Sequence, residues 1–260
     1  MSGSVQVTYE GRLARVAIDH PGKFNAMSRT MWRALRQVFL DIQENVGIHC
    51  VLVSGRHGHF CAGGDIAEYP DFRFDSQDLR EFHEGDVWGG LQAMLDCDTP
   101  IVAQIEGNCM GAGLEIASCC DLRFAGDSAR FGAPIARLGF PMAPREAALV
   151  MRAVGELTAR EMLLSAAVLD AIEMKRRGFL NQVVGARELD ATVQACVERM
   201  IPLAPRAARM NKQLIRALAL ESIDTNASEL IANCYHYADS AEHLEGIAAF
   251  IEKRPARFVR

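Results

Sequence analysis

The first part of the chain alternates short apolar runs with stretches in which apolar residues return every three or four positions. Residues 5–9 and 13–18 are β-rich runs joined by a turn-like spacer, which predicts an opening hairpin. Residues 31–42 then follow the helical period, with Ser28 placed to cap the helix. The continuous apolar run at 50–54 is typical of a strand buried on both faces. Strand, helix and strand in this order indicate a βαβ unit.

A second apolar region predicts two more strands, at 101–105 and 121–125, with a small-residue helix at 112–120 between them. The preceding segment, 67–90, is rich in charged and aromatic residues, lacks a sustained period and contains Pro70. We interpret it as a mobile, irregular excursion that lies near a site.

Beyond residue 143 the pattern becomes helical. Five helices are predicted, at 145–154, 157–165, 171–177, 188–201 and 205–220, with further helical segments toward the C-terminus. In the fifth, apolar positions follow the helical period and leave the basic side chains on other faces, so this portion could pack on its own core or on a neighbouring subunit. The pattern as a whole predicts one main α/β domain, a βαβ core followed by helices.

Composition narrows the functional classes. Half of the residues are apolar and 23% are charged, which is typical of an ordered globular protein. A net charge of −5 without a long basic run argues against a nucleic-acid partner. No apolar run approaches the roughly 20 residues that cross a bilayer, so no membrane partner is expected. The N-terminus lacks a secretory pattern, and the eight cysteines form no CxxC pair, so we expect a cytoplasmic protein without a metal site.

Two glycine-rich segments, at 60–65 and 110–115, are each predicted to follow a strand and precede a helix. In that context backbone N–H groups are left free to point at a ligand and can stabilise negative charge on a carbonyl oxygen. Each segment alone also fits an ordinary tight turn that needs positive φ. Because the two occur together, with specific flanking residues, we favour a shared anion site.

Six stretches of the chain resemble successive landmarks of the enoyl-CoA hydratase/isomerase (crotonase) family, in the family's order. They are HPGKFNAM (20–27), FCAGGDI (60–66), PIVAQIEGNCMGAGLEIASCCDLRFA (100–125), ARFGAPIARLGF (129–140), AARMNKQLI (207–215) and GIAAFIEKRPARF (246–258). The resemblance covers almost the whole length. It implies a ββα spiral core with an acyl-CoA site at 1–200 and a C-terminal helical trimerisation region at 201–260, in trimers that often pair into hexamers.

The resemblance also implies roles for particular residues. The N–H groups of Gly64 and Ala112 would be the oxyanion donors. Ala62, Asp65 and Ile66 would line the adenine and pantetheine path, Lys23 and Phe24 would lie near the CoA diphosphate, and Phe250 and Lys253 would supply an adenine-stacking ring and a phosphate-contacting cation, often across a subunit boundary. Without the resemblance, Phe250 would be interpreted as a core-facing helix residue and Lys253 as a solvated charge.

Acid and base groups are where the chain departs from the family. Glu115 matches the first of the two glutamates that hydratases of the family use to hold and activate water, although a carboxylate there would also fit a helix cap. Ile135 stands where the second glutamate is expected, and an aliphatic side chain neither holds water by hydrogen bond nor transfers a proton. Glu146 could supply a replacement carboxylate or could be a helix N-terminal charge.

The resulting hypothesis is an enzyme that stabilises a thioester enolate, by hydration or isomerisation of an enoyl-CoA. Coenzyme A would be part of the substrate, and no separate cofactor is expected. The alternatives are a catalytically weak acyl-CoA binding or scaffold member, and an acyl-CoA hydrolase or decarboxylase of the same fold. Three histidines flank the site, His57, His59 and His83; each reads as a surface residue, though His83 could reach a substrate.

Overall fold

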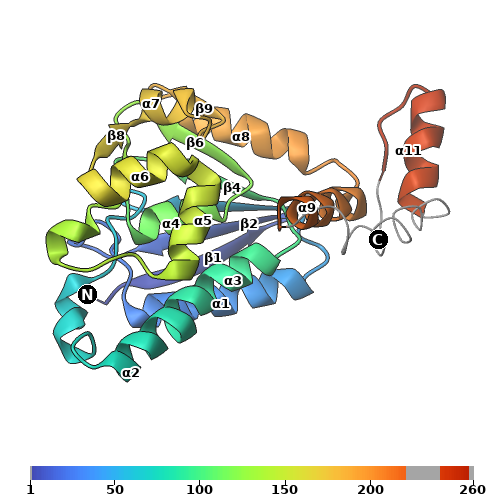
Figure 1. The fold of residues 1–260 in the computed structure, drawn as a ribbon. Coiled ribbons are helices and arrows are strands. Elements are labelled where there is room, and N and C mark those ends of the chain that lie inside the picture. Colours follow the sequence, from blue (N-terminus) through green and yellow to red (C-terminus); the bar gives the residue numbers. More distant parts are fainter. Residues whose placement is uncertain (1, 221–240, 258–260) are drawn as a thin grey trace.

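The computed structural model describes residues 2–220 and 241–257 (Figure 1). The chain opens with the predicted hairpin, in which β1 (Ser4–Glu10) pairs antiparallel with β2 (Leu13–Asp19). Helix α1 (Arg29–Glu44) follows, and the Ser28 hydroxyl accepts a hydrogen bond from the Met31 N–H at 3.2 Å, as expected of an N-cap.

Within the described residues the main sheet has six strands in the order β1-β2-β3-β4-β6-β9. Its remaining members are β3 (Cys50–Gly55), β4 (Ile101–Ile105), β6 (Leu122–Gly126) and β9 (Gln182–Val184). From β2 onward every neighbouring pair is parallel. The strands predicted at 50–54, 101–105 and 121–125 are therefore confirmed, whereas β9, only three residues long, lies in the part that we predicted to be helical.

Both faces of this sheet are buried, which explains the continuous apolar run in β3. Val51 and Val53 belong to the large core that includes α1, whereas Cys50 and Leu52 belong to a second core that faces α8 (Leu189–Met200). Figure 1 shows α8 and α1 on opposite sides of the strands. Alternate residues of one strand thus pack on different helical layers, as in other parallel sheets.

The segment predicted to be irregular is mostly helical instead. It forms the 3₁₀ helix η1 (Ile66–Asp71), helix α2 (Ser76–Arg80), the π-helix η2 (Glu81–Val87) and helix α3 (Trp88–Asp96). Three helix types with three different periods follow one another, so no single apolar period extends along the sequence. Buried Phe72 and Phe82 anchor this segment to the main core.

A second, small sheet supports the region after β4. It joins β5 (Asn108–Met110), β7 (Arg130–Gly132) and β8 (Val168–Asp170), with β5 and β7 parallel and β7 and β8 antiparallel. Helix α4 (Ala112–Ser118) begins directly after β5, and the 3₁₀ helix η3 (Ile135–Leu138) follows β7. Strands of three residues are too short for the alternation of apolar and polar positions to reveal them.

The five helices predicted beyond residue 143 are present. They are α5 (Pro144–Val154), α6 (Glu156–Ser165), α7 (Ala171–Arg176), α8 and α9 (Pro205–Leu220), and α11 (Ala241–Ile251) lies further along the chain. No helix within the described residues is long and apolar enough to span a membrane.

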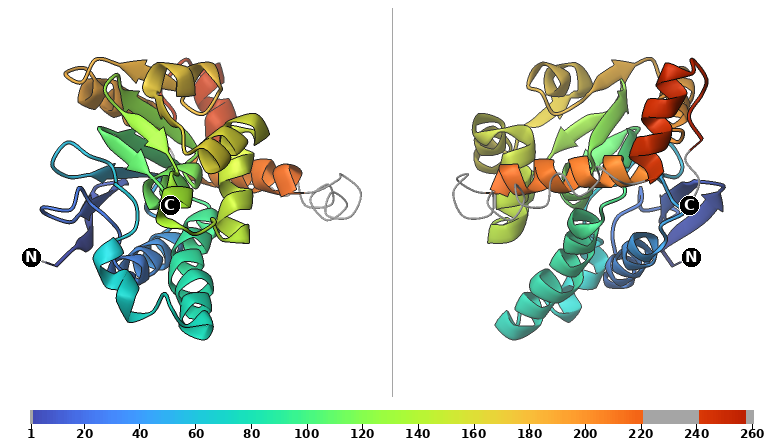
Figure 2. Two further views of the ribbon diagram at one scale, coloured as in Figure 1. Left: turned by 60° about the vertical axis from the view of Figure 1, so that its left-hand side comes forward. Right: turned by 90° about the vertical axis from the view of Figure 1, so that its right-hand side faces the viewer.

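Helix α9 attaches to the body of the molecule through its polar face. Arg209 donates to the carbonyl of Ile48, Lys212 to that of Thr99 and Arg216 to that of Leu95. These carbonyls precede β3 and β4, so α9 lies at the amino ends of the parallel strands. Figure 2 shows α9 side-on in orange, with α11 in red beyond it.

Candidate active site

The two glycine-rich turns meet at the opposite, carboxyl end of the strands. Isolated parallel bridges join Met27 to Gly64 and Cys61 to Cys109, which brings the first turn alongside β5. Gly63 and Gly111 both have positive φ, at 119° and 47°. A Cβ built on Gly111 would lie only 3.6 Å from the Gly63 Cα. The turns therefore contact each other through main chain, and it is their positive φ values that favour glycine at both positions.

The local context matches the prediction for one turn and corrects it for the other. The second turn follows β5 and precedes α4, as expected. The first follows the bridge at Cys61 rather than a regular strand, and it leads into η1 rather than an α-helix. Its conformation is held by Met27, which donates to the Gly63 carbonyl at 2.8 Å and accepts from the Asp65 N–H at 2.8 Å.

Backbone N–H groups without an acceptor remain at both turns, and those of Gly64 and Ala112 are the pair predicted from the sequence. The bridge to Met27 uses the groups on either side of Gly64 and leaves the Gly64 N–H unused. Ala112 is the first residue of α4, where an N–H has no partner within the helix. Within residues 2–220 and 241–257 neither N–H has a hydrogen-bond acceptor, and both residues line the same cavity.

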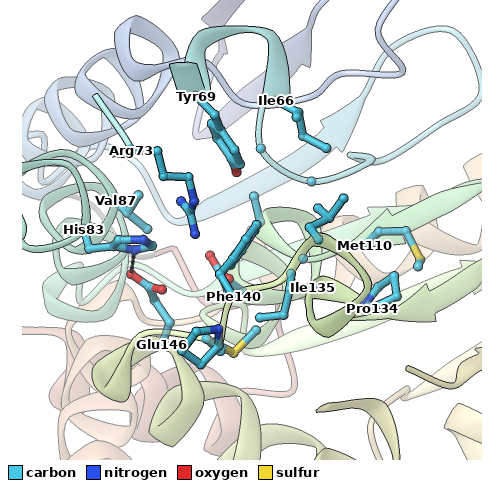
Figure 3. A pocket seen from close by; sticks show the side chains of 18 of the residues that line it. Ile66, Tyr69, Arg73, His83, Val87, Met110, Pro134, Ile135, Phe140 and Glu146 are labelled. Carbon is cyan, nitrogen blue, oxygen red and sulfur yellow. Dashed lines mark hydrogen bonds and ion pairs between the residues drawn. The ribbon is translucent and has the colours of Figure 1, made fainter. Parts of the chain in front are cut away.

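That cavity has a volume of about 300 Å³ and contains most of the residues predicted from sequence. The predicted residues along its wall are Ala62, Gly64, Ile66, Ala112, Glu115 and Glu146. Figure 3 shows its wall, with Ile66 and Met110 on one side and His83 and Glu146 on the other. Residues far apart in the sequence thus form one pocket.

Glu115 is buried in the first turn of α4, with 7% of its surface exposed. In the described part of the chain its carboxyl group has no hydrogen-bond or ion-pair partner. Burial raises its pKa well above the usual range, and the negative charge of Glu146 raises the pKa further. A carboxyl group in this setting holds its proton at a pH where an ordinary glutamate is ionised.

Glu146 lies in the first turn of α5 and is even less exposed, at 3%. The His83 ring nitrogen Nδ1 lies 3.0 Å from its Oε1, the contact drawn as a dashed line in Figure 3. Its Oε2 has no partner among the described residues. Glu146 therefore lies at the N-terminus of a helix and also lines the cavity, and its side chain faces inward rather than toward solvent.

Ile135 lines the same cavity from the start of η3. Its aliphatic side chain adds apolar surface where the family resemblance leads one to expect a carboxylate. The cavity nevertheless contains two carboxyl groups, because Glu146 reaches it from α5.

Lys23, Phe24 and Asp65 lie beside the cavity rather than along its wall. The Lys23 ammonium contacts the Asp65 carboxylate at 2.6 Å, and Asp65 also caps η1 by accepting from the Ala67 N–H. The Phe24 ring is 57% exposed, and its carbonyl accepts from the Ala62 N–H at 3.0 Å. Asp65 is thus buried in a local structural role, while Lys23 and Phe24 remain accessible at the side where Ala62 meets the pocket.

Other predicted residues are further away. Phe250 belongs to α11, but its side chain lies outside the described residues. Lys253 follows α11 with φ of 55° and is exposed. Figure 1 shows α11 apart from the layers that surround the cavity. Among the three flanking histidines, His83 lines the cavity, whereas His57 pairs with Asp19 and His59 accepts from a backbone N–H.

The aromatic and cationic part of the wall was not predicted from the sequence. Its members are Trp32, Tyr69, Arg73, Phe82 and Phe140. Three of them come from the segment at 67–90, whose unusual density of aromatic residues was the available signal. Burial raises the pKa of Tyr69 to about 12, so its hydroxyl remains protonated beside Gly64.

Several known proteins are similar to this chain in both sequence and fold. A probable enoyl-CoA hydratase of Mycobacterium bovis is 29% identical over 98% of this chain and 97% of its own length. A short-chain-enoyl-CoA hydratase of Clostridium acetobutylicum is 30% identical over 94% and 93%. The crystal structure of an enoyl-CoA hydratase/carnithine racemase from Magnetospirillum magneticum is 33% identical, covers 98% of this chain and 95% of its own, and superposes with a TM-score of 0.94.

The family model for enoyl-CoA hydratase/isomerase matches residues 8–260. This match covers nearly the whole chain, including the glycine turns and Glu115. The protein is therefore a member of the enoyl-CoA hydratase/isomerase family, with the crotonase fold.

Proposed function

We propose that the protein adds water to the double bond of a 2-enoyl-CoA. The observation that carries this proposal is the pair of buried carboxyl groups, Glu115 and Glu146, in one cavity with two unused backbone N–H groups. Several relatives that match over more than nine-tenths of the chain are named as enoyl-CoA hydratases. A hydratase needs a way to position water and to transfer protons, and two carboxyl groups supply both.

The thioester oxygen binds between the N–H groups of Gly64 and Ala112 in this proposal. Attack on the conjugated alkene moves an electron pair onto that oxygen, so donors aimed at it stabilise the enolate more than the ground state. The start of α4 adds the positive end of its dipole. Because the turns meet through main chain, both donors are fixed before the substrate arrives.

Glu146 and Glu115 divide the proton transfers. Glu146, held by His83 through Oε1, accepts a hydrogen bond from water through Oε2 and takes a proton as the water oxygen bonds to C3. Glu115, protonated because of its burial, gives its proton to C2 as the enolate collapses. The product is a 3-hydroxyacyl-CoA, and transfer of the gained proton from Glu146 to Glu115 returns both groups to their starting states. Water and the thioester supply all the atoms, so no separate cofactor is required.

Turnover of crotonyl-CoA and longer 2-enoyl-CoAs tests the proposal. Loss of the conjugated thioester absorbance should coincide with a product one water heavier by mass spectrometry. Glu146→Gln should lower kcat by about 100-fold or more, because a general base contributes 10²–10⁴-fold. Glu198→Gln, an exposed carboxylate on α8, is the matched control and should leave kcat unchanged.

Each competing function has its own outcome in this experiment. Tight CoA binding without turnover of any chain length would indicate a binding or scaffold member. Free CoA would indicate a hydrolase, and carbon dioxide a decarboxylase. Interconversion of 3-enoyl-CoA and 2-enoyl-CoA without gain of water would indicate an isomerase. Full activity of Glu146→Gln would remove Glu146 from the mechanism.

We further propose that copies of the chain associate through the outer face of α9, as trimers or hexamers. The polar face of α9 already contacts its own core, and this leaves Leu214, Ile215 and Leu218 exposed at 41%, 67% and 52%. An apolar stripe of this kind commonly marks a protein interface. Such an assembly could bring Phe250 and Lys253 to a neighbouring acyl-CoA site.

The cytoplasm is the proposed location. Seven cysteines lie in the described residues, and all seven are buried free thiols. Thiols of this kind fit a reducing compartment.

A further inference from the structure

Arg73 is a positive charge in the cavity that the proposed hydration does not use. It follows η1 and lines the pocket together with Glu115 and Glu146. Figure 3 shows its side chain extending toward Phe140, between Tyr69 and His83. In the part of the chain that the structure describes, no carboxylate lies within 4.0 Å of its guanidinium, and none of its side-chain N–H groups has an acceptor.

Its contacts are instead with aromatic rings. The guanidinium carbon lies 3.6 Å from the centre of the Phe140 ring and 4.6 Å from that of Tyr69. Stacking on rings fixes the plane of the guanidinium while leaving the N–H groups at its edge free. Burial lowers the pKa of Arg73 because the charge has lost part of its hydration, and the negative charge of Glu146, beyond 4.0 Å, offsets this only in part. The group is thus held ready for an anion.

The position of Arg73 indicates that an anion bound there would belong to the acyl chain of the substrate. Tyr69 lies between Arg73 and the reacting centre. The Tyr69 hydroxyl lies against Gly64, and the Arg73 guanidinium stacks on the Tyr69 ring. A thioester oxygen bound at Gly64 would therefore place the far end of a short acyl chain near Arg73. A neutral alkyl chain would cover this half-buried charge further without giving it a partner, which is unfavourable.

We propose that the preferred substrates are short 2-enoyl-CoAs whose acyl chain carries a distal carboxylate, which Arg73 binds with two parallel N–H···O hydrogen bonds. This inference rests on the proposed acyl-CoA site and names its substrate class. Guanidinium and carboxylate have matching forked geometries, so the pair selects strongly against uncharged chains.

Binding of saturated, unreactive analogues tests the inference without requiring turnover. Isothermal titration should show glutaryl-CoA binding at least about 10-fold more tightly than butyryl-CoA, since a charge-assisted hydrogen bond is worth about 1.5–3 kcal/mol. Arg73→Met should remove this preference, Arg73→Lys should retain part of it, and Arg160→Met, which removes an exposed charge on α6, should leave it intact. Circular dichroism would check that each variant is folded.

Three results would overturn the inference. Equal affinities of the wild-type protein for the two analogues would do so without any variant. An equal loss of affinity for glutaryl-CoA, butyryl-CoA and free CoA in Arg73→Met would assign Arg73 to the CoA phosphates. Retention of the preference in Arg73→Met would assign it to another group.

Turnover separates this inference from the proposed function. A preference for glutaryl-CoA without hydration of glutaconyl-CoA or crotonyl-CoA would contradict the hydratase proposal and support the role of Arg73. Hydration of both substrates with the same kcat/KM, and without a binding preference, would do the reverse.

Discussion

The burial of Glu115 suits the proton transfer proposed for it but lowers the stability of the folded protein at neutral pH. Its pKa is raised in the folded protein by burial and then by Glu146, whereas in the unfolded chain it titrates near 4.5. The folded state therefore retains a proton that the unfolded state has released. The contribution of this proton to the free energy of unfolding is fully present below pH 4.5. It is lost as the pH rises through the raised pKa of Glu115 in the folded protein.

Glu115→Gln should consequently stabilise the protein while reducing its activity. The amide cannot ionise, so the difference in Tm between variant and wild type should grow as the pH rises from 5 to 8, as measured by scanning calorimetry. The kcat for hydration should fall by about 10²–10⁴-fold. Glu198→Gln should show neither effect. A variant whose Tm differs from wild type by the same amount at every pH would contradict a raised pKa for Glu115.

For single residues, the sequence predicts which side chains and N–H groups belong to the site better than it predicts which residues contact one another. Gly64, Ala112 and Glu115 could be named from local motifs, and the structure places all three along the cavity. Whether Glu146 faced solvent or the cavity could not be determined, because the answer depends on how α5 packs. The contact with His83 joins residues 63 positions apart, and no local pattern specifies it.

Among the elements, α4 is the one whose position matters most for the site, since it carries both the Ala112 N–H and Glu115. It packs so closely against the first glycine turn that a Cβ on Gly113 would lie 2.5 Å from the Cys61 carbonyl oxygen and 3.0 Å from the Cys61 Cβ. Backbone atoms cannot move aside as the end of a flexible side chain can.

Gly113→Ala should therefore displace α4, with a loss of about 1–3 kcal/mol in the free energy of unfolding, typical of overpacking. The kcat should fall as well, because the displacement moves both functional groups of α4. Gly85→Ala in η2 provides the comparison, since its Cβ would meet only the Glu81 Cγ at 3.9 Å. Urea denaturation and turnover of both variants give the measurement, and equal stability of the two would show that the contact at Gly113 relaxes freely.

Long periodic elements could be predicted well and short or mixed ones could not. Helix α1 follows one apolar period over its whole length, and the buried strands β3 and β4 are nearly continuous apolar runs. The segment after Asp65 changes helix type within about thirty residues, so its apolar residues look irregular although Phe72 and Phe82 are buried. Three of the five residues in the aromatic and cationic part of the cavity wall come from this segment, so they were not predicted.

The whole molecule places chemistry and proposed association at opposite ends of the parallel sheet. The glycine turns follow the carboxyl ends of β3 and β4, and α9 contacts the carbonyls that precede these strands. The amphipathic pattern of α9 could be predicted from sequence, but the face that contacts the core could not. Lys212 and Arg216 reach Asp121 and Asp98, so the basic face is the inner one.

A double variant on the outer face of α9, Ile215→Glu with Leu218→Glu, should convert the assembly to monomers. Charges at these positions would be buried without partners in an interface, yet they would be solvated in the free chain. Light scattering after size exclusion measures the mass. Leu157→Glu, at an even more exposed apolar residue of α6, should leave the mass unchanged. An unchanged mass in the double variant would place the interface elsewhere.

The π-helix η2 gives the site an unusual dependence on chain length. A short π-helix contains one residue more than an α-helix that joins the same two ends. It is therefore the structure expected when a single residue is inserted into an α-helix. Deleting one residue between Arg80 and His83 would move His83 one position earlier along the helix and so turn its side chain by about 100°, while α3 beyond η2 could keep its place. His83 would then leave Glu146 while the overall fold remained. Insertions and deletions, rather than substitutions alone, are therefore a route by which relatives could gain or lose this acid/base arrangement.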